Sequence, residues 1–133
     1  MMTGLLLITH GRLGDDMLDT AKEILTACPL ATASIAVNSN SDPDQLLETA
    51  NRLCDDLDNG DGLLILTDLY GSTPSNIANR LIDTHNASVI SGANLPMLLR
   101  ILNYPEMSLE ALCDKAASGA RDGIVVTRQK QAS

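Results

Sequence analysis

The chain is 133 residues long, the size of one ordinary domain with a core of its own. Its formal net charge at pH 7 is −8, and an acidic surface argues against nucleic acid or an anionic membrane as the main partner. Such a surface favours a soluble protein that meets a basic patch on another molecule. Because Phe and Trp are absent and only two Tyr occur, the core must be built from Leu, Ile, Val, Ala and Met.

The start of the sequence carries no visible targeting signal. Met1 and Met2 precede a polar Thr-Gly pair, and the apolar run at residues 5–8 is too short for a secretory signal or a membrane span. The three cysteines are far apart, and no metal or cofactor motif occurs. We therefore expect one cytoplasmic domain over residues 1–133, with reduced cysteines, no metal, no cofactor and no direct membrane insertion.

Apolar runs and amphipathic stretches alternate along the chain. A buried strand is predicted over residues 5–9, and a helix follows over Asp15–Cys28, where Pro29 stops it. The same alternation then predicts strands at residues 31–37, 62–67 and 87–91, and helices at 43–57, 77–82, 95–102 and 109–117. The last apolar run, residues 123–127, predicts an isolated strand before a polar tail that frays.

This order of elements predicts a doubly wound α/β fold. Strands that alternate with helices through short connections form right-handed units and a mostly parallel sheet. We expect four strands in the flavodoxin-like order 2-1-3-4. The strand at residues 123–127 follows two helices, so its orientation stays open. It could form an antiparallel edge, or it could pair with another chain.

His10 is the most informative residue, because it ends the first apolar strand. Ligands of open α/β sheets collect outside the carboxyl ends of the strands. Gly11 lets backbone N–H groups approach such a ligand, and the helix that follows offers a positive dipole end that suits a phosphoryl group. The alternative is a strand-end histidine capped by a backbone carbonyl.

Asp68 ends the third predicted strand in the same way. If the first and third strands are neighbours, its carboxylate can hold one ring nitrogen of His10 as N–H. The other ring nitrogen then keeps a free lone pair, which is the nucleophilic form. Taken alone, Asp68 is typical of a turn or a helix cap.

Small polar residues complete the candidate site. Ser72 and Thr73 precede Pro74 at a predicted helix start, which is an N-cap pattern that can also bind phosphate oxygens. Asn38 leaves the second strand and could close the site from the other side, although a polar turn is the more usual explanation of such a residue. His85 is predicted near a helix C-terminus, where it meets the dipole, and receives no catalytic role.

In three segments the sequence resembles the IIA domain of the mannose (mannose–fructose–sorbose) family of the bacterial phosphoenolpyruvate-dependent sugar phosphotransferase system. The segments are Thr9-His10-Gly11, residues 67–76 and residues 92–98, in this order. The resemblance implies that His10 accepts a phosphoryl group from phospho-HPr and passes it to a IIB protein. It also implies that Asp68 positions His10 and that the hydroxyl of Thr73 helps to hold the phosphoryl group.

The resemblance further implies a homodimer in which residues 123–127 lie on the partner's sheet, and association with a membrane permease complex is possible. The sequence ends at Ser133 without a linker or a IIB domain, so we expect a free-standing IIA protein. Two alternatives stay open. One is a regulatory IIA protein, in which phosphorylation of His10 controls partner binding rather than sugar transport. The other is a flavodoxin-like hydrolase or ligand-binding domain, which no second acid or cofactor loop supports.

Overall fold

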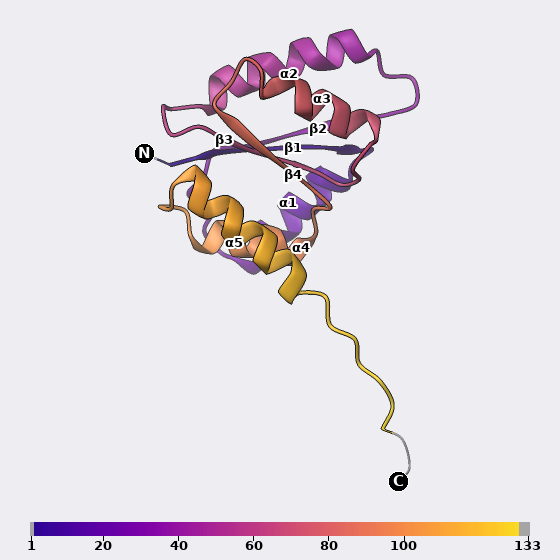
Figure 1. The fold of residues 1–133 in the computed structure, drawn as a ribbon, viewed down its shortest axis with the longest axis vertical. Coiled ribbons are helices and arrows are strands. Elements are labelled where there is room, and N and C mark those ends of the chain that lie inside the picture. The colour runs from indigo at the N-terminus through magenta and orange to yellow at the C-terminus, as the bar shows by residue number, and fades with distance from the viewer. Residues whose placement is uncertain (1, 131–133) are drawn as a thin grey trace.

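The computed structural model describes residues 2–130, in which one sheet lies between two layers of helices (Figure 1). In chain order the elements are β1 (Gly4–His10), α1 (Leu13–Ile24), β2 (Thr32–Val37), α2 (Pro43–Leu57), β3 (Leu63–Thr67), α3 (Thr73–Leu81), β4 (Ala87–Ser91), α4 (Leu95–Asn103) and α5 (Leu109–Asp122). Helices α2 and α3 cover one face of the sheet, and α1, α4 and α5 cover the other.

The strands lie in the order β2-β1-β3-β4, and every pair is parallel, which confirms the predicted α/β topology. His10 pairs in register with Val37 of β2, and Ile8 pairs with Thr67 of β3. The carboxyl ends of the three strands therefore reach the same edge of the sheet. His10 and the residue after Thr67, Asp68, both leave the sheet at this edge.

The two core layers explain why β1 is a continuous apolar run. Leu5 and Leu7 pack with α1, α4 and α5, whereas Leu6 and Ile8 pack on the side of α2 and α3. All four side chains are fully buried. A parallel strand covered on both faces needs apolar residues at every position rather than at alternate ones. No helix within residues 2–130 combines the length and hydropathy needed to cross a bilayer.

The first helix differs from its prediction at the C-terminal end. It ends at Ile24 rather than at Cys28, and Leu25 is already extended. The residue before a proline disfavours helical backbone, which opposes a helix that runs through Cys28. Helix α5 runs beyond its predicted end to Asp122.

The predicted strand at residues 123–127 is wrong within this chain. Gly123 continues the last turn of α5 through a hydrogen bond from its N–H to the carbonyl oxygen of Gly119. Residues 124–130 have no regular secondary structure, and Ile124, Val125 and Val126 are at least 70% exposed. The reason is the direction in which α5 ends, since the chain leaves the body there and does not return to the sheet (Figure 1). Whether this segment pairs with a second chain stays a prediction.

Candidate functional site

The strand ends bring His10 and Asp68 into direct contact. The ring Nδ1 of His10 lies 2.8 Å from Asp68 Oδ2. The backbone N–H of His10 donates to the same oxygen at 3.1 Å. The alternative in which a backbone carbonyl caps the ring of His10 is therefore wrong, because the carboxylate of Asp68 holds the ring.

This contact defines the chemistry of the ring. A carboxylate oxygen only accepts hydrogen bonds, so Nδ1 carries the proton and Nε2 of the neutral ring carries the lone pair. The side chain of His10 is 52% exposed, whereas that of Asp68 is 10% exposed. The ring thus faces solvent while the group that orients it is buried.

Asp68 is held in its charged form. Burial on its own raises the pKa of Asp68, but hydrogen bonds from the ring and from the backbone N–H of His10 lower it, and the pKa lies below its ordinary value. The second carboxylate oxygen, Oδ1, is buried and has no hydrogen-bond partner within residues 2–130. Both hydrogen bonds that this carboxylate makes with another residue in this part of the chain are therefore with His10.

Gly11 shapes the turn after His10. Its φ is 50°, a left-handed conformation that glycine adopts without strain. Its N–H donates to the carbonyl oxygen of Val37 at 2.9 Å. The N–H of Gly11, which we expected to approach a ligand, thus donates to β2 instead. Gly11 contributes the left-handed conformation of the turn.

The start of α3 places two hydroxyl groups at the same edge of the sheet. The hydroxyl of Ser72, the N-cap residue, donates to the carbonyl oxygen of Leu69 at 2.6 Å and makes no capping bond. A hydroxyl has one proton to donate, so this bond occupies it. The hydroxyl of Thr73 is exposed and has no hydrogen-bond partner within residues 2–130. Of the two groups, Thr73 is the one ready to donate to a ligand.

Asn38 follows Val37, the residue opposite His10 in the sheet. Its backbone N–H donates to Ser41 Oγ at 2.9 Å. This bond forms the polar turn that was the alternative expectation for Asn38. The side chain is exposed and makes no hydrogen bond in the described part of the chain. Asn38 therefore lies at the correct edge but makes no hydrogen bond to His10 within residues 2–130.

His85 lies at the opposite edge of the sheet, just before β4 begins. Its Nε2 is 2.9 Å from Asn51 Oδ1, and its Nδ1 is 3.7 Å from Asp55 Oδ1. The ring is mostly buried between α2 and the end of α3. His85 is part of the packing between these elements and is separate from the candidate site.

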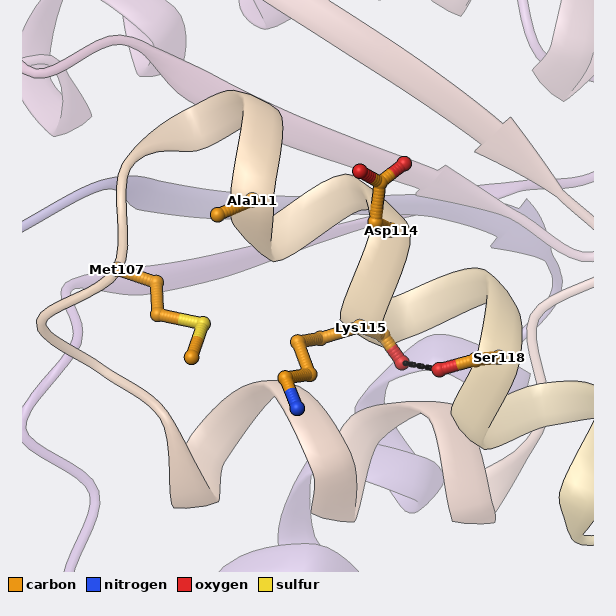
Figure 2. A pocket seen from close by; sticks show the side chains of 5 residues that line it. All are labelled: Met107, Ala111, Asp114, Lys115 and Ser118. Atoms are coloured by element: carbon orange, nitrogen blue, oxygen red, sulfur yellow. Dashed lines mark hydrogen bonds between the residues drawn. The ribbon is translucent and has the colours of Figure 1, made fainter.

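A hollow of about 450 Å³ lies elsewhere, on α5 and the segment before it (Figure 2). It is lined by Met107, Ala111, Asp114, Lys115 and Ser118, none of which is near the carboxyl edge of β1. The ammonium of Lys115 lies 4.6 Å from the centre of the Tyr104 ring. The two charged residues in its lining, Asp114 and Lys115, point in different directions (Figure 2).

Sequence reasoning missed one contact close to the site. The backbone N–H of Gly14 donates to Thr9 Oγ1 at 2.8 Å, and both residues are buried. No sequence signal indicated it, because the predicted helix began at Asp15, whereas in the structure α1 begins at Leu13 with Arg12 as its N-cap residue and no side-chain capping bond.

Comparison with known proteins agrees with the geometry. Residues 4–117 match the family described as "PTS system fructose IIA component" (EIIA-man). The chain belongs to this mannose–fructose IIA family of the phosphotransferase system. The resemblance of its three sequence segments is thereby confirmed.

Individual relatives support the same assignment. The chain is 29% identical to the mannose-specific EIIAB component of the phosphotransferase system from Escherichia coli K12, over 98% of its own length. It spans 41% of the length of that relative. Among solved structures, the mannose/sorbose-specific IIA subunit from Enterococcus faecalis superposes with a TM-score of 0.87 at 21% identity, over the whole of both chains. The EIIA component from Streptococcus agalactiae gives a TM-score of 0.84 at 25% identity, over 94% of this chain and 97% of that chain.

Proposed function

We propose that this IIA protein is a phosphocarrier in which His10 accepts a phosphoryl group from phospho-HPr and passes it to a IIB protein. One observation carries the proposal: Asp68 holds Nδ1 of His10 at 2.8 Å, which leaves Nε2 on the solvent-facing side of the ring as the nucleophile. Membership of the IIA family supports a role in phosphoryl transfer within the sugar phosphotransferase system.

The proposed step needs no cofactor. The lone pair on Nε2 forms a bond to phosphorus while the phosphorus–nitrogen bond of the donor's phosphohistidine breaks, and the electrons of that bond return to the donor ring. The His10 ring keeps its Nδ1 proton and gains a positive charge as the donor ring loses one. Asp68 is charged and lies against that proton, so it stabilises the phosphorylated ring.

Groups around the ring would hold the phosphoryl oxygens. Thr73 supplies a free hydroxyl, and the first N–H groups of α3 lack partners within the helix and attract anions. Asn38 lies at the same edge, and Gly11 gives the turn its conformation. Ser72 would join them only if its hydroxyl left the carbonyl oxygen of Leu69. Phosphoryl transfer depends mainly on such positioning and charge stabilisation.

The proposal extends to assembly. Strand β4 lies at an edge of the sheet, and the apolar segment Ile124–Val126 is exposed beyond α5. An unpaired edge and an exposed apolar segment are both aggregation hazards unless something covers them. We infer a homodimer in which this segment pairs with the partner's sheet. Association with a membrane permease complex would follow from the IIB acceptor.

The function is tested by labelled transfer. The protein is incubated with ³²P-phosphoenolpyruvate, enzyme I and HPr, purified, and then mixed with a IIB protein of the mannose family. We expect about one label per chain and its loss to IIB. Absence of label would contradict the phosphocarrier function. Label that no IIB protein accepts, but that changes binding to another protein, would favour the regulatory alternative.

A further inference from the structure

Thr9 makes a buried hydrogen bond across the turn that carries His10. Its side chain is fully buried, and its Oγ1 accepts from the N–H of Gly14 at 2.8 Å. Residues 10–13 lie between the two partners. The bond therefore closes a short loop that contains His10 and joins the end of β1 to the first turn of α1.

This bond replaces a missing helix cap. An N-cap side chain normally accepts a hydrogen bond from the second or third residue of its helix. The N-cap residue of α1 is Arg12, which makes no such bond. Gly14 is the second residue of α1, so Thr9 accepts the N–H that a local cap would have taken. The cap comes from the strand that ends at His10.

Packing beneath the turn is equally tight. A Cβ added to Gly14 would lie 2.7 Å from Ser34 Oγ and 3.0 Å from Thr9 Oγ1. Real Cβ atoms essentially never lie as close as the first distance, and the second is tighter than nine in ten real Cβ contacts. The helix start can approach β1 and β2 this closely only because residue 14 is glycine. The hydrogen bond to Thr9 and the close packing against Ser34 thus both fix the position of Gly14 in the first turn of α1.

Three bonds together restrain the turn around His10. His10 is held through its N–H to Asp68, Gly11 through its N–H to Val37, and Gly14 through its N–H to Thr9. The first two restrain only the start of the turn. The Thr9 bond is the one that restrains its far end, where α1 begins.

We infer that Thr9 is a positioning residue for phosphoryl transfer, acting through the turn that it closes. This inference rests on the proposed function of His10. Without the Thr9 hydroxyl the far end of the turn is released, and the buried N–H of Gly14 loses its acceptor. The ring of His10 then holds its position on Asp68 for a smaller share of the time, so fewer encounters with the donor are productive.

The test compares Thr9→Val with Thr9→Ser and Thr3→Val. Valine keeps the shape of threonine and removes the acceptor, whereas serine keeps the hydroxyl. Thr3 is a matched control just before β1, because it is equally buried and its hydroxyl has no partner within residues 2–130. Two readouts are used: the single-turnover rate of transfer from phospho-HPr, and the ¹⁵N NMR signal of the protonated Nδ1 of His10.

We expect Thr9→Val to slow transfer about tenfold, as for loss of one buried hydrogen bond, and to weaken the Nδ1–H signal. Thr9→Ser should restore both, and Thr3→Val should change neither. The inference is overturned if folded Thr9→Val keeps both wild-type readouts, or if Thr3→Val slows transfer equally. The NMR measurement does not require phosphorylation. It therefore tests the role of Thr9 even if the wild-type protein accepts no phosphoryl group and the phosphocarrier function is wrong.

Wild-type protein provides a test that does not need Thr9→Val to fold. Hydrogen exchange of the Gly14 amide should be slow before and after phosphorylation, since the bond to Thr9 is expected in both states. Fast exchange in either state would show that the turn is not held at this point, and the inference would fail.

Discussion

Asp68 holds His10 at two points through a single oxygen, Oδ2, which accepts from the backbone N–H at 3.1 Å and from ring Nδ1 at 2.8 Å. The backbone bond fixes where the residue lies, and the ring bond fixes which nitrogen carries the proton. Both restraints depend on β1 and β3 being neighbours in the sheet. The topology of the sheet thereby determines which ring nitrogen of His10 keeps its lone pair.

Asp68→Asn should slow phosphoryl transfer to His10 by about 10²-fold, the usual cost of losing an orienting group. The amide lacks the charge that stabilises the phosphorylated ring, and its NH₂ group can favour the wrong tautomer. Rapid-quench measurement of transfer from phospho-HPr gives the rate, with circular dichroism to establish folding. Asp83→Asn, an exposed residue at the opposite edge, is the control. A folded Asp68→Asn protein with the wild-type rate would refute the role.

Acid should remove the stability that Asp68 provides. The pKa of Asp68 is lower in the folded protein than in the unfolded chain, where an unperturbed Asp side chain has a pKa of about 3.9. The unfolded chain then binds more protons in this range, so the contribution is complete above that pH and is lost as pH falls through the lower folded pKa. Urea unfolding of wild type and Asp68→Asn is measured from pH 7 downward. The difference in free energy of unfolding between the two proteins should shrink below about pH 4. A difference that grows on acidification would contradict this.

Cys54 should resist thiol reagents until the protein unfolds. Its side chain is fully buried, and burial together with the neighbouring Asp55 and Asp58 raises the pKa of the thiol to about 11. The thiolate is the reactive form, so both access and ionisation oppose modification. Iodoacetamide at pH 8 followed by peptide mass spectrometry should label the partly exposed Cys28 first. Equal labelling of Cys54 and Cys28 in the folded protein would contradict this.

The full chain should sediment as a dimer at micromolar concentration. Val125→Lys places a charge in the middle of the exposed apolar segment, so it should yield a folded monomer. Deletion from Gly123 onward should yield a monomer or insoluble protein, whereas Lys130→Ala, in the polar tail, should leave the dimer intact. A stable monomer of the unaltered chain would show the dimer proposal to be wrong.

The strand order and the contact between His10 and Asp68 were both accessible from the sequence. β1 and β3 are short runs rich in Leu and Ile, which are typical of parallel strands covered on both faces, and short connections restrict their order. Residues at the exits of adjacent parallel strands must then lie close together. The prediction needed the flavodoxin-like strand order, which places β1 beside β3, in addition to the apolar pattern.

Details that depend on individual hydrogen bonds were not accessible. Nothing in the sequence indicated that the N–H of Gly11 pairs with Val37, or that the proton of Ser72 is given to Leu69. The bond between Thr9 and Gly14 joins a strand to a helix across the turn, and residue types alone do not reveal it. The path of residues 124–130 depends on the direction in which α5 ends, which periodicity does not encode.

The most direct test of the account asks which nitrogen of which histidine carries the phosphoryl group. The protein is phosphorylated with phosphoenolpyruvate, enzyme I and HPr, and ³¹P and ¹⁵N NMR then assign the phosphoramidate in wild type, His10→Ala and His85→Ala. We predict an acid-labile, base-stable phosphate on Nε2 of His10, absent from His10→Ala and unchanged in His85→Ala. A phosphate on Nδ1 of His10, label on His10→Ala, or loss of label in His85→Ala would contradict it.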